Sequence, residues 1–282
     1  MKNVSGKRIL ITGAAMGMGR IYAKLSANEN ASAIVLWDRD PKGLQESAKE
    51  LSDFEGKLLL HTLDLSDPKR ILESLYLVRK EIGSIDILIN NAGIVCGKYF
   101  WEHDPDSEIG SVISINALAP MLLTRHLLPD MMGDPSRDFR IVNIASAAGL
   151  ISNPKMSVYC ASKWALTGWS DSLRLELEKT GNDHVKVTTV NPAYISTGMF
   201  EGVKGMLFTP ILSPEYVVSK VWKAMKKGSP RLILPWTVYL SCFLKGLLPI
   251  RVFDWIAGNI FGVYETMEKF KGRTGQILKK VD

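Results

Sequence analysis

A tyrosine four residues before a lysine, which puts a phenol and an ammonium on one face of a helix, occurs three times in this sequence. The pairs are Tyr76/Lys80, Tyr159/Lys163 and Tyr216/Lys220. Only the middle pair follows a suitably placed hydroxyl. Ser146 lies thirteen residues before Tyr159, at the end of an apolar run, where open α/β sheets bind ligands. The middle pair alone can form a cluster of hydroxyl, phenol and ammonium, groups that hold and exchange protons.

A glycine-rich turn follows the first apolar run of the chain. Its glycines have the spacing GxxxGxG, and its residues include Gly13, Met16, Gly17, Met18 and Gly19. Such a turn between a strand and a helix lets backbone N–H groups and the helix N-terminus face a pyrophosphate, with no Cβ in the way. The sequence therefore predicts a dinucleotide site here.

The second apolar run ends at Asp38, nineteen positions beyond Gly19. A carboxylate at that place accepts hydrogen bonds from the adenosine ribose of NAD and repels the 2′-phosphate of NADP. The adjacent Arg39 could instead receive that phosphate. We expect NAD as the cofactor, with NADP as the alternative.

Short apolar runs alternate with longer amphipathic stretches, which predicts strands alternating with helices. The expected strands are residues 8–13, 33–38, 58–64, 85–90, 139–146, 184–191 and 231–234. The expected helices are residues 17–28, 41–53, 67–82, 107–132, 158–180 and 214–227. Strands that are apolar throughout and separated by helices form a parallel sheet covered on both faces. We expect one α/β domain, a doubly wound (Rossmann-type) parallel sheet flanked by helices.

Together these motifs resemble the short-chain dehydrogenase/reductase family over residues 7–197. The matching positions are the glycine-rich turn at 12–19, Asp64, the Asn-Asn-Ala-Gly run at 90–93, Asn116, Ser146, Tyr159/Lys163 and Asn191-Pro192. The chain departs from the family at the methionines of the turn and at Ala193, where the family usually has glycine. As a whole it is most similar to the hydroxysteroid and retinol dehydrogenase-like branch. The resemblance implies an oxidoreductase that transfers a hydride between an alcohol and the cofactor.

The resemblance also implies roles for four catalytic residues. Tyr159 would be the general acid/base, so the pKa of its phenol must fall by about 3 from its usual value near 10. The ammonium of Lys163 and the positive nicotinamide both favour phenolate, and Lys163 would also bond the nicotinamide ribose. Ser146 would hold the substrate oxygen. Asn116 would support a water that relays the proton from Lys163.

The cofactor contacts follow from the same resemblance. Asp64 would bond the adenine, and Ile195 and Thr197 would hold the carboxamide. The full set of expected contacts is Gly13, Met16, Gly17, Met18, Gly19, Asp38, Arg39, Asp64, Leu65, Asn91, Ala92, Gly93, Tyr159, Lys163, Pro192, Ile195 and Thr197, with Asn90 beside them.

The composition excludes several other classes of protein. With 46% hydrophobic and 23% charged residues, the 282-residue chain is an ordinary globular protein rather than a disordered one. Its three cysteines and four histidines are scattered without CxxC or HExxH spacing, so we expect no metal site, no disulfide framework and a cytoplasmic location. There is no known nucleic-acid-binding motif, and we expect no nucleic-acid partner.

The segment after Pro192 is apolar, with only Glu201 and Lys204 charged between Tyr194 and Ile211, so it cannot clamp a phosphate or a sugar acid. We expect a hydrophobic pocket for a secondary or long-chain alcohol, such as a steroid, retinoid or lipid, rather than ordinary loop packing. The expected apolar residues are Val95, Leu150, Ile151, Met156, Tyr194, Ile195, Met199, Phe200, Val203, Met206, Leu207, Phe208 and Ile211. Two alternatives are an NADP-dependent carbonyl reductase and a non-catalytic NAD-binding protein on the same fold.

The last part of the chain differs in charge from the rest. Residues 201–282 carry 13 Lys+Arg against 6 Asp+Glu, whereas residues 1–200 carry 22 against 23. We expect a catalytic domain over residues 1–235 and an apolar helical extension over residues 236–282, whose uncharged run is too short to span a membrane. The extension either packs on the core or a second subunit, as in a homodimer or homotetramer, or lies at an anionic membrane surface beside the basic residues.

Overall fold

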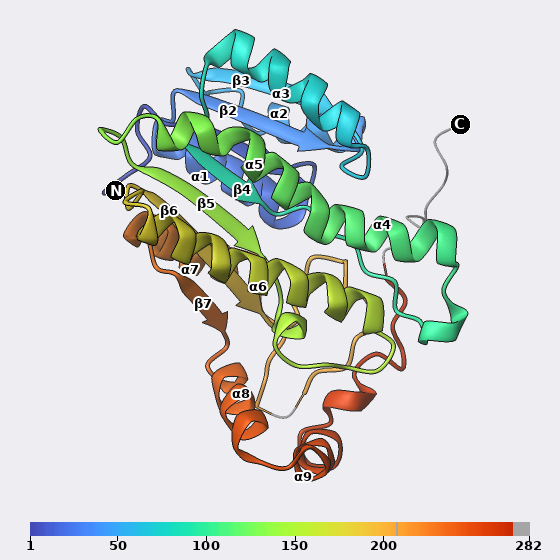
Figure 1. Ribbon diagram of the computed structural model, residues 1–282. Coiled ribbons are helices and arrows are strands. Elements are labelled where there is room, and N and C mark those ends of the chain that lie inside the picture. The colour runs from blue at the N-terminus through green and yellow to red at the C-terminus, as the bar shows by residue number, and fades with distance from the viewer. Residues whose placement is uncertain (207, 273–282) are drawn as a thin grey trace.

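The computed structural model describes residues 1–206 and 208–272, and the strands of this part form one parallel sheet. Its seven strands stand in the order β3-β2-β1-β4-β5-β6-β7 (Figure 1). The strands are β1 (Arg8–Thr12), β2 (Ala33–Asp38), β3 (Lys57–Thr62), β4 (Ile87–Asn90), β5 (Phe139–Ile144), β6 (Val185–Pro192) and β7 (Arg231–Leu234). The order reverses between β1 and β4, which is the point where a doubly wound sheet binds its ligand.

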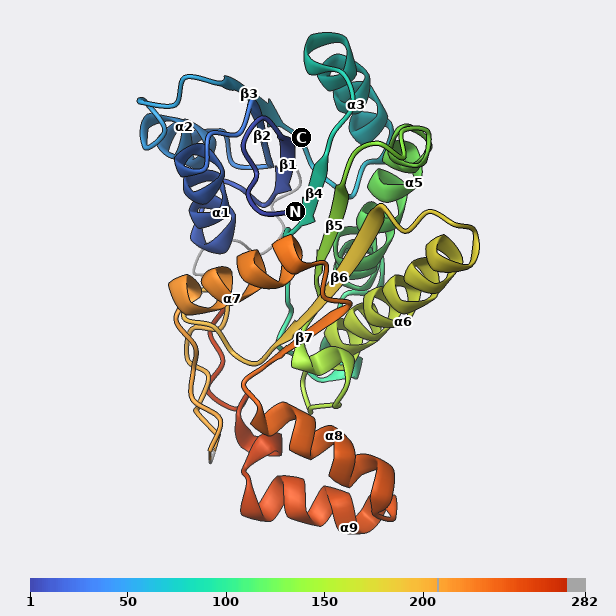
Figure 2. The same ribbon diagram turned by 90° about the vertical axis from the view of Figure 1, so that its left-hand side faces the viewer.

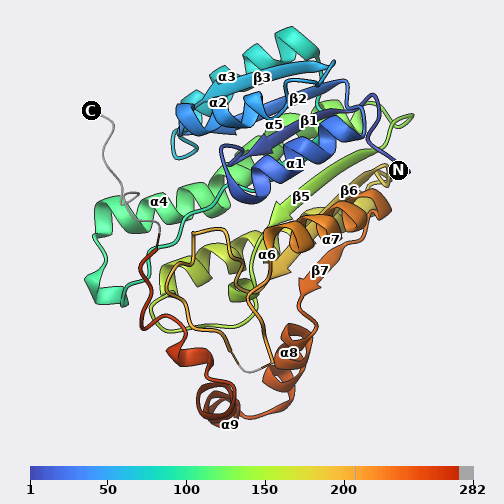
Figure 3. The same cartoon turned by 180° about the vertical axis from the view of Figure 1, so that it is seen from behind.

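Helices cover both faces of the sheet, as Figures 2 and 3 show. One face packs on α1 (Gly17–Asn28), α2 (Pro41–Lys49) and α7 (Pro214–Lys227). The other packs on α3 (Pro68–Ile82), α5 (Ala119–Met132) and α6 (Ser157–Lys179). Each face buries its own apolar cluster, so strand residues that alternate along β1 divide between the two, with Ile9 and Ile11 on the first face and Leu10 on the second.

Local signals explain where several helices begin. The Asp67 carboxylate accepts hydrogen bonds from the backbone N–H groups of Lys69 and Arg70, and Pro68 occupies the first position of α3. The predicted helix over residues 41–53 is shorter in the structure because α2 ends at Lys49. Beyond that point the chain turns, so that Leu51 enters the first apolar cluster and Phe54 packs against it.

The long helical stretch before β5 is not regular. Two π-helical turns, Pro105–Ile109 and Ser114–Leu118, flank the short helix α4 (Gly110–Ile113), and the second turn leads directly into α5. π-helical turns within helices are frequent at functional sites. The second of them contains Asn116, one of the predicted catalytic residues, which is fully buried.

The residues after β7 form a separate layer beyond the carboxyl ends of the strands, at the bottom of Figure 1. It consists of α8 (Thr237–Leu247), α9 (Ile250–Trp255), a π-helical turn (Ile256–Ile260) and a return segment over residues 263–272. Only Thr237 and Val238 of α8 and Phe253 of α9 are buried. The remaining predicted part of the extension, residues 273–282, lies outside the described residues, as does Leu207.

Candidate active site

A cleft crosses the carboxyl ends of the central strands, between the glycine-rich turn and α6. It brings together all but three of the predicted catalytic and cofactor-binding residues, since Gly19, Asn90 and Asn116 lie behind its lining. The predicted residues on its wall are Gly13, Met16, Gly17, Met18, Asp38, Arg39, Asp64, Leu65, Asn91, Ala92, Gly93, Ser146, Tyr159, Lys163, Pro192, Ile195 and Thr197. Sequence reasoning missed the cofactor-cleft residues Leu63, Ile94, Ile115, Ile144 and Ala145, which carry no chemical signature.

The glycine-rich turn has no room for side chains on its inner side. A Cβ on Gly19 would lie 2.1 Å from the carbonyl oxygen of Gly13, and one on Gly13, whose φ is +67°, would lie 2.9 Å from the Cα of Ala92. The Asn91 amide donates to the carbonyl oxygens of Thr12 and Gly13, so the loop after β4 holds the turn in place. A close backbone turn that leads into a helix fits the pyrophosphate of a dinucleotide.

The Asp38 carboxylate is held at the edge of this cleft by backbone N–H groups. One oxygen accepts from Ala15 at 3.0 Å and the other from Asp40 at 3.1 Å. The side chain therefore has one position relative to the turn, as recognition of a ribose diol requires. Arg39 lines the same cleft. Asp64 lies further along it, with one oxygen bonded to the backbone and hydroxyl of Ser66 at 2.8 Å each.

Tyr159 and Lys163 point from α6 toward the end of β5, and both are nearly fully buried. Lys163 Nζ donates to the carbonyl oxygen of Ile144 at 2.8 Å and lies 5.7 Å from the centre of the Tyr159 ring. The Ser146 hydroxyl accepts from the backbone N–H of Ala148 at 3.1 Å. Ser146, Tyr159 and Lys163 share the cleft with Pro192. The other two Tyr–Lys pairs lie outside it, with Tyr76 and Tyr216 68% and 44% exposed.

The Asn116 side chain holds the loop after β4. Its amide nitrogen donates to the carbonyl oxygen of Ile94 and to the Ser162 hydroxyl, and its oxygen accepts from the N–H of Ile94. A Cβ on Gly93 would lie 3.3 Å from Asn116 Oδ1 and 3.5 Å from Lys163 Nζ, so these two atoms flank one glycine. Both amide hydrogens are therefore donated to protein groups, Ile94 and Ser162. The role of Asn116 in a proton relay stays a prediction.

The family model of the short chain dehydrogenases matches residues 7–206 of this chain. The chain belongs to the short-chain dehydrogenase family. It is 37% identical to mouse epidermal retinol dehydrogenase 2 over 276 residues, which cover 96% of this chain and 87% of the relative. It is 32% identical to zebrafish retinol dehydrogenase 10-A over 277 residues, which cover 89% and 80%. The protein is therefore an NAD(P)-dependent oxidoreductase on the predicted fold.

Two solved structures have the same fold. One is a short-chain dehydrogenase/reductase from Burkholderia phymatum in complex with NAD, with a TM-score of 0.79, 23% identity and coverage of 88% of this chain and 95% of that one. The other is a metagenomic short-chain oxidoreductase in complex with NADP, with a TM-score of 0.67, 28% identity and coverage of 82% and 96%. The family therefore uses both cofactors.

Burial acts on both titratable groups of this dehydrogenase site. It raises the pKa of the Tyr159 phenol, and the neighbouring Ser146 hydroxyl offsets part of that rise. It lowers the pKa of the Lys163 amine to about 7. Both shifts favour the neutral form, because a low-dielectric site disfavours charge of either sign. In the ligand-free protein, burial therefore works against the expected phenolate–ammonium pair.

A second pocket, of about 470 Å³, adjoins the cleft at Ser146 and Ala193. Its walls are largely apolar and come from the loop before α6, the segment after β6 and the C-terminal layer. Six residues predicted for a hydrophobic pocket line it: Ile151, Met156, Tyr194, Phe200, Met206 and Phe208. Others lie elsewhere: Ile195 and Met199 line the cofactor cleft, and Val95 and Val203 pack beside Tyr159. Leu150 packs beside Val238, and Ile211 is exposed.

The C-terminal layer supplies the pocket residues that sequence reasoning missed. They are Trp236, Thr237, Val238, Leu240, Ser241, Leu244, Phe253, Ile256, Ala257, Phe261 and Val263. The sequence predicted an apolar helical extension over these residues but gave no sign that its surface faces the active site. Asn153 also lines the pocket. The one sequence feature that could have pointed to it is its position six residues before Tyr159.

We expect the stability of the ligand-free protein to depend on pH through Lys163. Its pKa of about 7 lies below the value near 10.4 of an unfolded lysine, so between these values the unfolded state binds more protons. Raising the pH should then stabilise the folded protein. Urea unfolding at pH 7 and pH 9 should show a gain of about 2 kcal/mol for wild type over Lys163→Met. An equal pH dependence in the two proteins would contradict the buried, titrating amine.

Proposed function

We propose that this protein is a dehydrogenase that uses NAD to oxidise a hydrophobic secondary or long-chain alcohol, such as a retinoid, steroid or lipid. The observation that carries this is the largely apolar pocket of about 470 Å³ that meets the polar site at Ser146. A pocket of this kind orients an apolar substrate by a few polar groups at one end. The names of the relatives, retinol dehydrogenases from mouse and zebrafish, point to the same substrate class.

In this proposal the chain positions the alcohol and removes its proton, while the bound nicotinamide supplies the hydride acceptor. Ser146 holds the substrate oxygen, and Tyr159 takes its proton. As an ammonium, Lys163, one helical turn away and bonded to the Ile144 carbonyl, favours the phenolate form that Tyr159 needs in order to take that proton. An amine with a pKa of about 7 is matched to exchange protons near neutral pH. Asn116 holds the loop beside that amine.

The complete set of side chains also weighs against a non-catalytic cofactor-binding protein. Burying an amine and a phenol costs desolvation free energy, and a protein that only binds the cofactor gains nothing catalytic in return. The alternative, a carbonyl reductase that uses NADP, requires the attraction of the 2′-phosphate by Arg39 to exceed its repulsion by Asp38.

We expect the protein to bind NAD about tenfold or more tightly than NADP, a difference of about 1.4 kcal/mol, because the fixed Asp38 carboxylate repels a 2′-phosphate. Asp38→Asn should weaken that preference by removing the charge while keeping a side chain that can bond the ribose. Fluorescence titration of both cofactors measures the ratio. Tighter binding of NADP to wild type would overturn the preference and favour the reductase.

We expect Tyr159→Phe to lower turnover about 100-fold or more, as loss of a general acid/base does, while NAD affinity stays within a few-fold. Lys163→Met should reduce both, because the lysine also contacts the cofactor ribose in this proposal. The assay is a panel of apolar alcohols, including retinol and a hydroxysteroid, followed at the NADH absorbance. Tyr76→Phe and Tyr216→Phe are matched controls and should retain wild-type rates. Equal loss of NAD binding in the first two variants would show that the roles are wrongly divided.

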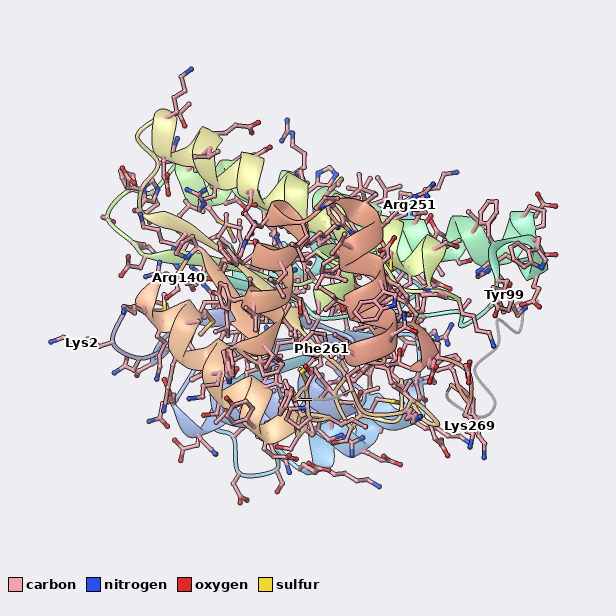
Figure 4. The ribbon with its side chains drawn as sticks, turned by 90° about the horizontal axis from the view of Figure 1, so that it is seen from below. Lys2, Tyr99, Arg140, Arg251, Phe261 and Lys269 are labelled. Atoms are coloured by element: carbon pink, nitrogen blue, oxygen red, sulfur yellow. The ribbon has the colours of Figure 1, made fainter. Side chains whose placement is uncertain are left out.

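We further propose that the C-terminal layer lies in a membrane surface. Large apolar side chains of this layer are 60–70% exposed, and they come from α8, α9 and the turns beside them: Trp236, Phe243, Leu247, Ile250 and Trp255. Figure 4, seen from below, shows α8 and α9 side by side at this end of the molecule. Trp236 and Leu240 also line the substrate pocket, so the pocket reaches the same surface. An apolar substrate could then enter from the lipid without crossing water.

The sequence predicted basic residues beside the apolar extension, but among the described residues the larger excess of positive charge lies on α7 rather than on the C-terminal layer. In the described part of the layer, Lys245, Arg251, Lys269 and Lys271 stand against Asp254, Glu265 and Glu268, so its charges nearly balance, whereas α7 carries Lys220, Lys223, Lys226 and Lys227 against Glu215 alone. Lys245 is also engaged, since it donates to the Leu150 carbonyl and stacks over Trp164. Insertion of apolar side chains therefore dominates the proposed contact, and anionic lipid adds little.

One other stretch is apolar enough to be considered at a membrane. Residues Pro105–Met132 form a helical run long enough to span a bilayer by length and composition, but 56% of its apolar window is buried inside the fold. This burial is typical of a core helix.

We expect the protein to sediment with phosphatidylcholine vesicles, with only a small gain from anionic lipid and little loss in high salt. The double substitution Phe243→Ser and Leu247→Ser should abolish sedimentation without changing NAD affinity, because neither residue lines the pocket or the cleft. Leu175→Ser, on an exposed side chain of α6, is the matched control. Protein that stays in the supernatant, and that elutes as an oligomer which the double substitution dissociates, would instead make this surface a subunit contact.

A further inference from the structure

The return segment of the C-terminal layer reaches the active site through Thr266, which is 1% exposed. Three polar side chains from distant parts of the chain meet there: Asn153 before α6, Tyr194 after β6, and Thr266. Asn153 Nδ2 lies 2.9 Å from Tyr194 Oη and 2.8 Å from Thr266 Oγ1, and the two hydroxyl oxygens are 2.9 Å apart. We call these three residues the polar triangle.

In one arrangement of protons, every hydroxyl and N–H group of the polar triangle is satisfied without a further side chain, although the Tyr194 hydroxyl also lies within donating distance, 3.7 Å, of the Met156 sulfur. The two amide hydrogens of Asn153 go to Tyr194 and Thr266, and the Tyr194 hydroxyl donates to Thr266. The Thr266 hydroxyl in turn donates to the carbonyl oxygen of Val263 at 2.9 Å. Thr266 Oγ1 thus accepts two hydrogen bonds and donates one, which uses its whole capacity. In this arrangement the Thr266 oxygen accepts from both of the other side chains, so removing its hydroxyl takes a hydrogen-bond partner from each of them.

The polar triangle is joined to the catalytic tyrosine by a row of aromatic rings. The Tyr194 ring packs edge-on against Phe200 with centroids 5.1 Å apart, and Phe200 packs edge-on against Tyr159 at 6.0 Å. Met267, the residue after Thr266, belongs to the same buried cluster as Tyr159 and Tyr194. A change in the position of Tyr194 therefore reaches the catalytic phenol through one intervening ring.

Several contacts hold the return segment against the two loops that border the site. The Lys204 N–H donates to the Thr266 carbonyl, and the Lys271 N–H to that of Glu201. On the other side the Phe270 ring occupies the space above Gly97, where a Cβ would lie 2.1 Å from it. The segment thus bridges the loop after β4 and the apolar segment after β6. Its position beside the phenol is a packed arrangement, not a loose chance contact.

We propose that Thr266 is a positioning residue of the dehydrogenase, which holds Tyr194 and, through Phe200, keeps the Tyr159 phenol aligned with Lys163 and the cofactor. This makes the C-terminal layer a part of the catalytic site as well as a wall of the substrate pocket. The inference rests on the proposed role of Tyr159 as the general acid/base.

The test compares Thr266→Val, which keeps the shape but removes the hydroxyl, with Thr266→Ser, which keeps the hydroxyl. The matched control is Thr124→Val, the same change at a buried threonine of α5 whose hydroxyl has no hydrogen-bond partner. In each protein bound to NAD, the Tyr159 phenol is titrated by its ultraviolet phenolate absorbance, as the difference from the same protein carrying Tyr159→Phe. This measurement needs no alcohol substrate.

We expect Thr266→Val to raise the pKa of the Tyr159 phenol by about one pH unit, because a misaligned phenolate loses contact with the positive charges beside it. With an alcohol that wild type oxidises, kcat should fall about tenfold at neutral pH, as one unit predicts, while KM and NAD affinity change less than twofold. Thr266→Ser and Thr124→Val should match wild type in all these quantities.

Two outcomes would overturn the inference. A phenol pKa in Thr266→Val equal to that of wild type would show that the polar triangle does not align Tyr159. Equal losses of kcat and NAD affinity in Thr266→Val and Thr266→Ser would show a general loss of packing rather than loss of a hydroxyl. If wild type binds NAD and its phenol titrates but it oxidises none of the alcohols, the proposed function fails, and the phenol pKa still decides the role of Thr266.

Discussion

Buried asparagine side chains at the carboxyl ends of the central strands hold the catalytic helix against the sheet. Asn90 of β4 donates to Asn143 of β5 at 2.8 Å, and Asn143 donates to the Ser170 hydroxyl of α6 at 2.8 Å. Asn191 of β6 donates to the Ser146 carbonyl at 2.9 Å and lies 3.2 Å from the Thr167 hydroxyl of α6. Because buried polar groups are costly when unpaired, these bonds permit one placement of α6. Because Tyr159 and Lys163 stand on α6, these bonds also fix where their side chains lie. The hydrogen bond from Lys163 to the Ile144 carbonyl adds one more contact between α6 and β5.

The same placement explains why the polar residues of the site are held rigidly, while the apolar walls of the second pocket can vary. In the proposed site, Ser146 and the glycine-rich turn directly follow strands, and Tyr159 and Lys163 stand on α6, so the backbone hydrogen bonds of these elements fix where each group lies. The substrate walls come instead from the segment after β6 and from the C-terminal layer. Such segments can change in sequence without disturbing the hydrogen bonds between the strand ends and α6. The same catalytic residues can therefore serve different apolar alcohols.

The sequence was sufficient to predict the parts of the molecule that depend on local rules. The parallel sheet follows from short, wholly apolar runs, and the glycine-rich turn and Asp38 follow from what a pyrophosphate and a ribose need. Three identical Tyr–Lys spacings could be separated because only Tyr159 has Ser146 upstream, and the structure places only that pair in the cleft. The pKa shifts could not be predicted, because they depend on how deeply each group is buried.

What sequence could not predict is the contribution of the C-terminal layer. The apolar stretch after residue 235 predicted a helical extension, but the same pattern fits a core helix, a subunit contact or a membrane surface. Thr266 carries no motif at all, since its partners Asn153 and Tyr194 lie 113 and 72 positions away. Only the folding back of the chain onto the site brings them together.

Because the chain folds back in this way, the C-terminal layer carries both exposed apolar side chains and residues that pack around Tyr159. Helix α8, which exposes Phe243 and Leu247, also lines the second pocket with Leu240, and the chain that follows it passes through Phe253 of α9 to the polar triangle. The proposed entry of substrate, the pocket wall and the proposed alignment of the Tyr159 phenol therefore involve one stretch of about 40 residues, a size that cannot bury a core of its own. The layer must take its stability from contacts with the sheet domain, such as Thr209 with Thr237 and Asn153 with Thr266. A layer that is stable only when seated on the active site is suited to couple the surface where, in our proposal, an apolar substrate arrives to the residues proposed to hold it and take its proton.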